Sequence, residues 1–377
     1  MTAPRTTQIK PPPGLIDFGI GQPRPDLLPL ELLRKAAAQR LGSGDAAYLS
    51  YGRGQGDDFF RRALAAFLSR EYGLPVAPDD LFITAGASQG LDMFCSLFSR
   101  PGDTIFVEEP SYFLALRIFA DHGLKIVSLP MDSEGVIVEG LEAKIIRHRP
   151  VFLYTIPTFH NPSSATLSAR RRQELVGLSA RHNLMIVADE VYHLLGFSAV
   201  PPAPLAGDIE TAPVISLGSF SKIMAPGLRL GWIMAAKALL KRLTGCGLVD
   251  SGGGLNPFTS GIVRSAMEMG LLDEQLKRLR ATYRDNKLAL TRALRDHLSP
   301  RADFVAPGGG FFIWLKFTRE VDTAKMLAKA RSENVGYLPG ARTSSQGGLH
   351  NFARLSFAYY DEARLVQGVA RLAKVFA

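Results

Sequence analysis

The chain has 377 residues, of which 46% are hydrophobic and 21% charged, and its formal net charge is +9. This length exceeds one typical core and fits two or three compact units, and the composition is that of an ordinary globular protein. Every apolar run is shorter than the roughly 18 residues of a spanning helix, and the N-terminus lacks the apolar core of a signal peptide. We therefore expect a cytoplasmic protein with no membrane partner.

The positive charge raises the question of nucleic acid. Basic residues occur in short groups such as Arg61-Arg62 and Arg170-Arg171-Arg172, interleaved with acids and apolar residues, and form no basic arm with stacking aromatics. This pattern is typical of solvated helix faces, so we expect no nucleic-acid partner. The charge would suit anionic small molecules. Cys95 and Cys246 lie far apart in apolar or small-residue segments, which indicates buried thiols and no metal site or disulfide.

The first elements in chain order are an extended arm, two helices and a loop. We expect the arm over residues 1–14, a helix over Pro29–Leu41, a glycine-rich loop over Tyr51–Gly56 and a helix over Asp57–Glu71. Beyond them, short apolar strands alternate with helices that begin near residues 88, 112, 140 and 168. This alternation predicts an α/β fold with a mostly parallel seven-stranded sheet between helices. The expected strands are Leu81–Thr84, Thr104–Glu108, Lys125–Leu129, Val151–Ile156, Leu184–Asp189, Val214–Leu217 and Gly231–Ala235.

A long helical stretch over Pro257–Leu298 leads to a smaller α+β unit. Its expected strands are Gly310–Lys316, Val335–Leu338 and Ala353–Phe357. We expect residues 1–45 to form the arm and part of the small domain, residues 46–295 the large domain, and residues 296–377 the rest of the small domain.

The chemically distinctive residues follow the predicted strands. Asp189 ends one strand, Asn161 follows another, and Ser219 and Lys222 follow a third. Ligands of an open α/β sheet bind outside the carboxyl ends of its strands, so these residues are expected to form one site.

Lys222 stands beside two hydroxyls, with Arg229 seven residues further on across a Pro-Gly turn. The free pKa of lysine lies near 10.4, and proteins lower it chiefly to make a nucleophile, typically for a Schiff base with a cofactor carbonyl. The hydroxyls and the arginine suit a phosphate group. The alternative is a solvated loop lysine, but the neighbours are glycine, proline and apolar residues.

Asp189 follows a buried strand and precedes Tyr192. Burying a carboxylate is costly unless a cation pairs with it, and a protonated pyridine nitrogen would be such a cation. Tyr192 and the amide of Asn161 could both contact the phenolate oxygen of the same ring. Simpler readings remain open: Asp189 could cap the next helix, and Asn-Pro could mark only a turn. His160 is expected to be structural.

Three further features complete the predicted site. The Ala87–Gln89 turn opens a helix, whose N-terminal N–H groups could bind the phosphate together with Ser219, Ser221 and Arg229. The segment is neither a Walker loop nor a dinucleotide fingerprint.

Tyr112 could stack on a planar cofactor or belong to the core. Arg354 alternates with apolar residues on a predicted strand, and its planar fork matches a carboxylate, with a surface ion pair as the alternative.

Together these segments resemble the pyridoxal-phosphate-dependent aminotransferases of fold type I, class I/II, and most closely their aminoadipate, kynurenine and aromatic branch. The resemblance runs from the Phe18–Pro23 segment to the Arg354 strand. It implies pyridoxal 5'-phosphate as cofactor, amino acids and 2-oxo acids as substrates, and a homodimer with shared active sites.

The resemblance also implies roles for single residues. Lys222 would form the internal aldimine, Asp189 would pair with the pyridine nitrogen, and Arg354 would bind the substrate carboxylate. Tyr51 would reach the phosphate of the neighbouring subunit. The remaining implied contacts are Asn161 and Tyr192 on the ring oxygen, Tyr112 on the ring face, Ser219, Ser221, Arg229, Ala87, Ser88 and Gln89 on the phosphate, and Gly21 and Asn161 in the substrate pocket.

The chain departs from the family pattern in places. Ala87-Ser88 stands where many relatives have Ser-Gln, and the segment 339–344 lacks the phenylalanine that many relatives carry after Pro-Gly. The second departure leaves the substrate open, and Arg24 and Arg342 could each recognise an acidic side chain.

The implied activity is transfer of an amino group from an L-amino acid to a 2-oxo acid, with 2-oxoglutarate as the expected acceptor, in ping-pong order. A C–S lyase acting by β-elimination and an amino-acid racemase remain alternatives, because pocket geometry decides the fate of the shared carbanion. A further alternative is a non-catalytic effector-binding module, as in regulators that fuse this fold to a DNA-binding domain. We expect no room for such a domain before Gly21.

Overall fold

The computed structural model describes residues 11–198 and 200–376, so most of the arm predicted for residues 1–14 lies outside the described part of the chain. A large sheet forms the middle of the molecule, with strands in the order β2-β9-β8-β7-β6-β3-β4-β5. Their bounds are β2 (Leu81–Thr84), β3 (Thr104–Glu109), β4 (Lys125–Asp132), β5 (Gly135–Val136), β6 (Phe152–Thr155), β7 (Met185–Asp189), β8 (Val214–Ser219) and β9 (Gly231–Ala235).

The mostly parallel sheet predicted from the sequence is confirmed. Strands β4, β3, β6, β7 and β8 pair in parallel, whereas β9 runs antiparallel between β8 and β2. The sheet has one strand more than predicted, because the two-residue strand β5 turns back on β4. Such a short edge strand carries no alternation that a sequence could reveal.

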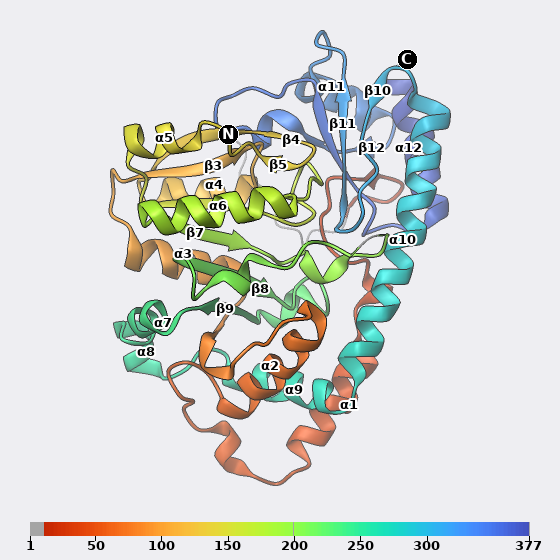
Figure 1. The fold of residues 1–377 in the computed structure, drawn as a ribbon. Helices are drawn as coiled ribbons and strands as arrows, with labels where there is room; N and C mark the ends of the chain where they lie inside the picture. Colours follow the sequence, from red (N-terminus) through yellow and green to blue (C-terminus); the bar gives the residue numbers. More distant parts are fainter. Residues whose placement is uncertain (1–10, 199, 377) are drawn as a thin grey trace.

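Helices cover both faces of this sheet (Figure 1). Successive side chains of a strand point to opposite faces, so Phe106 of β3 lies in one core and Val107 in the other. The first core also takes residues of α2 (Asp58–Tyr72), α5 (Leu141–His148) and α6 (Ala169–His182). The second takes residues of α3 (Ala87–Phe98), α4 (Phe113–Asp121) and α7 (Lys237–Thr244).

The predicted helical stretch over residues 257–298 is two helices, α9 (Pro257–Glu268) and α10 (Leu271–Leu298). Gly270 separates them at φ +72°, a left-handed conformation that glycine adopts without strain. Helix α9 packs on α1 (Leu30–Leu41) and α2, and α8 (Gly247–Gly252) precedes it. Figure 1 shows α10 running along one side of the molecule towards α12 (Glu362–Val375), on which it packs.

The C-terminal unit contains a second, antiparallel sheet in the order β10-β11-β14-β13. The single strand predicted over Val335–Leu338 is wrong, because β12 pairs in parallel with β1 of the N-terminal segment whereas β13 joins β14. The bounds are β1 (Ile16–Asp17), β10 (Ala302–Asp303), β11 (Phe312–Phe317), α11 (Thr323–Ser332), β12 (Val335–Gly336), β13 (Leu338–Pro339) and β14 (Phe352–Ser356).

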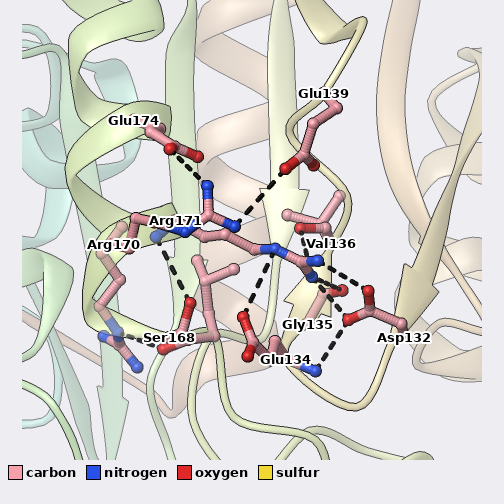
Figure 2. Close-up of polar contacts among 11 residues, drawn as sticks. Asp132, Glu134, Gly135, Val136, Glu139, Ser168, Arg170, Arg171 and Glu174 are labelled. Atoms are coloured by element: carbon pink, nitrogen blue, oxygen red, sulfur yellow. Dashed lines mark hydrogen bonds and ion pairs between the residues drawn. The ribbon is translucent and has the colours of Figure 1, made fainter.

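A buried arginine fastens the edge of the large sheet to α6 (Figure 2). Two nitrogens of Arg171 donate to the two carboxylate oxygens of Asp132, at 2.6 and 2.7 Å, and Nη1 also donates to the carbonyl of Gly135 at 3.1 Å. This contact holds the pKa of Asp132 below its usual range. The neighbouring Arg170 is exposed and pairs with Glu174 along the helix. In the described residues, no helix is long and apolar enough to cross a membrane.

Candidate active site

A cavity of about 760 Å³ lies at the carboxyl ends of β3, β6, β7 and β8, closed on the other side by the N-terminal segment and the C-terminal unit. Most of the predicted site residues line it. These are Gly21, Ala87, Ser88, Tyr112, Asn161, Asp189, Tyr192, Ser219, Ser221, Lys222, Arg229 and Arg354. The structure therefore brings together residues that are up to 333 positions apart in the sequence, from Gly21 to Arg354.

Lys222 follows β8 and extends into the cavity. Its Nζ donates to the carbonyl oxygen of Gly21 at 3.3 Å and lies 5.8 Å from the ring centroid of Tyr192. Burial lowers the pKa of Lys222 to about 8, and the positive charges of Arg354 and Arg229 act in the same direction. The amine is thus much easier to deprotonate than that of a free lysine.

Asp189 ends β7 and is 7% exposed. Its Oδ2 accepts a hydrogen bond from the hydroxyl of Tyr154 at 2.7 Å, whereas Oδ1 is buried and has no partner among the described residues. Burial raises the pKa of Asp189, because the carboxylate loses its hydration. A cationic N–H donor in the cavity would satisfy Oδ1 and favour the ionised carboxylate, as a protonated pyridine nitrogen does.

Arg354 lies on β14 and is 3% exposed. Its Nη1 donates to Oδ1 of Asn161 at 2.7 Å, and its Nη2 donates to the carbonyl of Gly19 at 2.8 Å. The guanidinium also lies over the ring of Phe312, 4.0 Å from the centroid. Burial lowers the pKa of Arg354 to about 10, and a charge buried with only neutral partners is suited to receive a carboxylate.

The opposite end of the cavity combines the start of α3 with the segment after β8. Gly86 precedes α3 at φ +97°, and a Cβ atom there would come within 2.7 Å of Nη2 of Arg229. The first N–H groups of α3 have no partners within the helix, so they can bind an anion together with this arginine. The Oγ of Ser219 accepts a hydrogen bond from the backbone N–H of Ser221 at 3.1 Å, and this bond orients the Ser219 hydroxyl at this end of the cavity. This end fits a phosphate group.

Two predicted residues do not line the cavity. Gln89 turns its side chain back, and its Oε1 accepts from the N–H of Ala85 at 3.1 Å. Tyr51 is 88% exposed and lies outside the cavity of its own chain. Arg24 also lies outside the cavity and pairs with Asp26 at 2.7 Å, whereas Arg342 lines the cavity from the turn after β13.

Two polar residues near the site, Tyr154 and Glu108, are not among the predicted site residues. Tyr154 lies within an apolar strand and looked like a core residue. Glu108 accepts from the N–H of Ile156 at 2.8 Å and lies 3.2 Å from Nε2 of His160, with both side chains buried. Their position beneath the Asn161 loop agrees with the structural role expected for His160. Only the acid at the end of β3 gave a signal in the sequence.

In comparisons with known proteins, both the sequence and the structure match aminotransferases. The sequence model of the family described as "Aminotransferase class I and II" matches residues 13–372. The aromatic-amino-acid aminotransferase 1 of Thermococcus litoralis is 33% identical, covering 96% of this chain and 87% of that protein. The 2-aminoadipate transaminase of Thermus thermophilus is 31% identical, covering 96% and 90%. The solved structure of kynurenine aminotransferase from Pyrococcus horikoshii, in complex with PMP, has a TM-score of 0.90 at 30% identity and covers 96% of this chain and 91% of that one.

Proposed function

Because the chain belongs to the class I and II aminotransferases, in the branch of the aromatic and aminoadipate enzymes, we propose that Lys222 is its catalytic residue. The protein is a fold type I aminotransferase that depends on pyridoxal phosphate. The observation that carries the proposal is that Lys222 and Asp189 line the same cavity, and that Oδ1 of Asp189 has no partner among the described residues.

The proposed cofactor contacts follow from the geometry of the cavity. Asp189 pairs with the ring nitrogen, and pyridoxal phosphate supplies an electron sink at that protonated nitrogen when it is bound. Tyr112 covers the ring face. The ring oxygen is bound by Asn161 and Tyr192, and the phosphate by the backbone of Ala87 and Ser88 at the start of α3 together with Ser219, Ser221 and Arg229.

The proposed substrate contacts are made by Arg354 and Gly21. Arg354 binds the α-carboxylate with its planar fork. Gly21 leaves room for the substrate, since a Cβ atom at this position would come within 3.0 Å of Phe312 and 3.5 Å of Nη2 of Arg354. With the cofactor bound, the free amine of Lys222 would be the base that takes the proton from the substrate Cα, and its ammonium form would be the acid that returns this proton. Holding the Cα–H next to this amine makes the transfer intramolecular.

Dicarboxylic acids are the proposed substrate class for at least one half of the reaction, with 2-oxoglutarate as acceptor. One relative acts on 2-aminoadipate, which carries a second carboxylate. Arg342 lines the cavity and its side chain is exposed, so it is available for such a group. The lining residues Ile20, Ile118 and Leu338 would cover a methylene chain.

The proposal includes a homodimer with shared active sites. The exposed Tyr51 is accompanied by other exposed apolar side chains nearby in the fold, among them Leu49, Phe59 and Phe258. Exposed apolar side chains of this kind suit contact with a second copy of the chain. Mixing Lys222→Ala and Tyr51→Ala subunits should restore up to about a quarter of the activity by creating one intact site per hybrid dimer. No recovery after proven subunit exchange would exclude the shared site.

The domain division is also part of the proposal. Residues 46–295 form the large cofactor-binding domain, and residues 1–45 and 296–377 form the arm and the small domain. The pairing of β1 with β12 supports this division, because it joins the N-terminal segment to the C-terminal unit. The cytoplasmic location and the absence of a nucleic-acid partner stay predictions.

The activity is tested by the visible absorption spectrum of the purified holoenzyme, recorded as single L-amino acids are added without an oxo acid. Transamination converts the starting band to that of the amine form of the cofactor, and 2-oxoglutarate reverses the change. A starting band that recovers while pyruvate or racemised amino acid accumulates would instead assign the lyase or the racemase. The Lys222→Ala variant should show no conversion, and substantial turnover without added amines would exclude Lys222 as the catalytic base.

A further inference from the structure

Tyr154 and Asp189 lie on neighbouring parallel strands, and Asp189 lines the cavity. Tyr154 of β6 is in register with Val187 of β7, and side chains two residues apart on a strand share a face, so Asp189 lies on the face of Tyr154. The phenol hydroxyl donates to Oδ2 at 2.7 Å, and both side chains are buried. The bond is therefore fixed by strand register and not by a mobile loop.

The hydroxyl of Tyr154 is a donor that does not titrate in the working range. Burial and the nearby charge of Asp189 raise the pKa of Tyr154 well above its usual value, so the phenol keeps its proton. The same hydrogen bond lowers the pKa of Asp189 and opposes the effect of burial. A histidine in this place would lose or gain charge near neutral pH, whereas the phenol donates one proton at every relevant pH.

The bond makes the two oxygens of Asp189 inequivalent. Oδ2 is occupied, whereas the buried Oδ1 has no partner among the described residues. We propose that Tyr154 is a positioning residue, which holds Asp189 ionised and turned so that Oδ1 alone faces the ring nitrogen of the bound cofactor. This inference rests on the proposed role of Asp189 and adds the residue that orients it.

The test compares Tyr154→Phe with Tyr283→Phe in the holoenzyme. Tyr283 is a matched control, because its hydroxyl is buried like that of Tyr154 but, among the described residues, has no hydrogen-bond partner. Tyr154→Phe should raise the dissociation constant of pyridoxal phosphate about 10- to 100-fold, the loss expected for a hydrogen bond to a charged group. It should also move the acid limb of kcat/KM to higher pH, since the carboxylate becomes easier to protonate. Tyr283→Phe should change neither quantity.

A double-mutant cycle with Asp189→Asn shows whether Tyr154 acts through Asp189. When Tyr154→Phe is combined with Asp189→Asn, it should change cofactor affinity less than about threefold relative to Asp189→Asn alone. The inference is overturned if Tyr154→Phe leaves the dissociation constant and the pH limb at their wild-type values, or if its effect is equally large in both backgrounds. The dissociation constant is measured without turnover. A wild-type protein that binds the cofactor but transaminates nothing would therefore refute the proposed function and still test Tyr154.

Discussion

The guanidinium of Arg354 donates a 2.7 Å hydrogen bond to the side-chain oxygen of Asn161. Because Oδ1 of Asn161 accepts this bond, its amide nitrogen is the part left to donate elsewhere. One contact thus links the proposed carboxylate site on β14 to the proposed ring-oxygen site after β6. The proposed substrate-binding residue and the proposed cofactor-binding residue are therefore in direct contact.

The Arg354→Lys substitution tests the carboxylate site. Lysine keeps the charge but loses the planar fork, so we expect KM for the amino donor to rise about 10- to 100-fold. Steady-state kinetics measures this, and the visible band of the holoenzyme serves as the control for a loaded site. An unchanged KM with a normal band would show that the α-carboxylate binds elsewhere.

The pH dependence of cofactor attachment tests Lys222. Only the neutral amine can attack the aldehyde of pyridoxal phosphate, and the pKa of Lys222 is lowered to about 8. The rate of reconstitution of the apoenzyme should therefore rise with pH through about 8 and level off above it. Stopped-flow absorbance gives this profile. A rate still rising above pH 9 would show that the lysine keeps an ordinary pKa.

The Arg342→Gln substitution tests the substrate class. We expect kcat/KM for L-2-aminoadipate relative to that for L-leucine to fall about two- to fivefold, a modest effect because the Arg342 side chain is exposed. Arg24→Gln is the matched control, since Arg24 pairs with Asp26 outside the cavity. If the ratio does not change, Arg342 has no part in selecting dicarboxylic acids.

The Arg171→Ala substitution tests the buried contact in Figure 2. It removes the Arg171 hydrogen bond to the carbonyl of Gly135 and the cationic partner of Asp132, whose Oδ1 then accepts, among the described residues, only from the N–H of Glu134. We expect a loss of about 1–3 kcal/mol of unfolding free energy, less than for a fully buried pair because Asp132 is partly exposed. Arg170→Ala, one residue away on the exposed surface, should cost under about 0.5 kcal/mol.

The ion pair between Arg171 and Asp132 also predicts how the unfolding free energy depends on pH. Arg171 lowers the pKa of Asp132 in the folded protein, so its stabilisation is present above the unfolded pKa of about 3.9 and is lost as pH falls through the lower folded pKa. Denaturant unfolding of the wild type and of Arg171→Ala should therefore converge at acidic pH. Curves that stay equally far apart at every pH would contradict the ion-pair account.

The strands and helices of the large sheet could be predicted because their periodicity is local. Residues such as Asp189 and Lys222 stood out because a charge after an apolar strand is unusual. Tyr154 could not be recognised, since a tyrosine within a buried strand is common and its partner lies 35 positions away on the next strand. The short strands β5 and β10 could not be predicted for another reason, because two residues are too few to show an alternation of apolar and polar side chains.

Helix α10 has 28 residues, which corresponds to a rod about 42 Å long. Near its start, the Gln275 amide donates to the carbonyl of Leu27, and further along, the Asn286 amide donates to the carbonyl of Phe357. One continuous rod is thus fastened both to the segment that enters the cavity and to the unit that bears Arg354. Between these two points, Nε of Arg280 donates to the carbonyl of Leu194, which follows β7 of the large sheet. The helix is therefore hydrogen-bonded to both sides of the cavity, and we expect the two sides to separate only if the helix tilts or one of these bonds breaks.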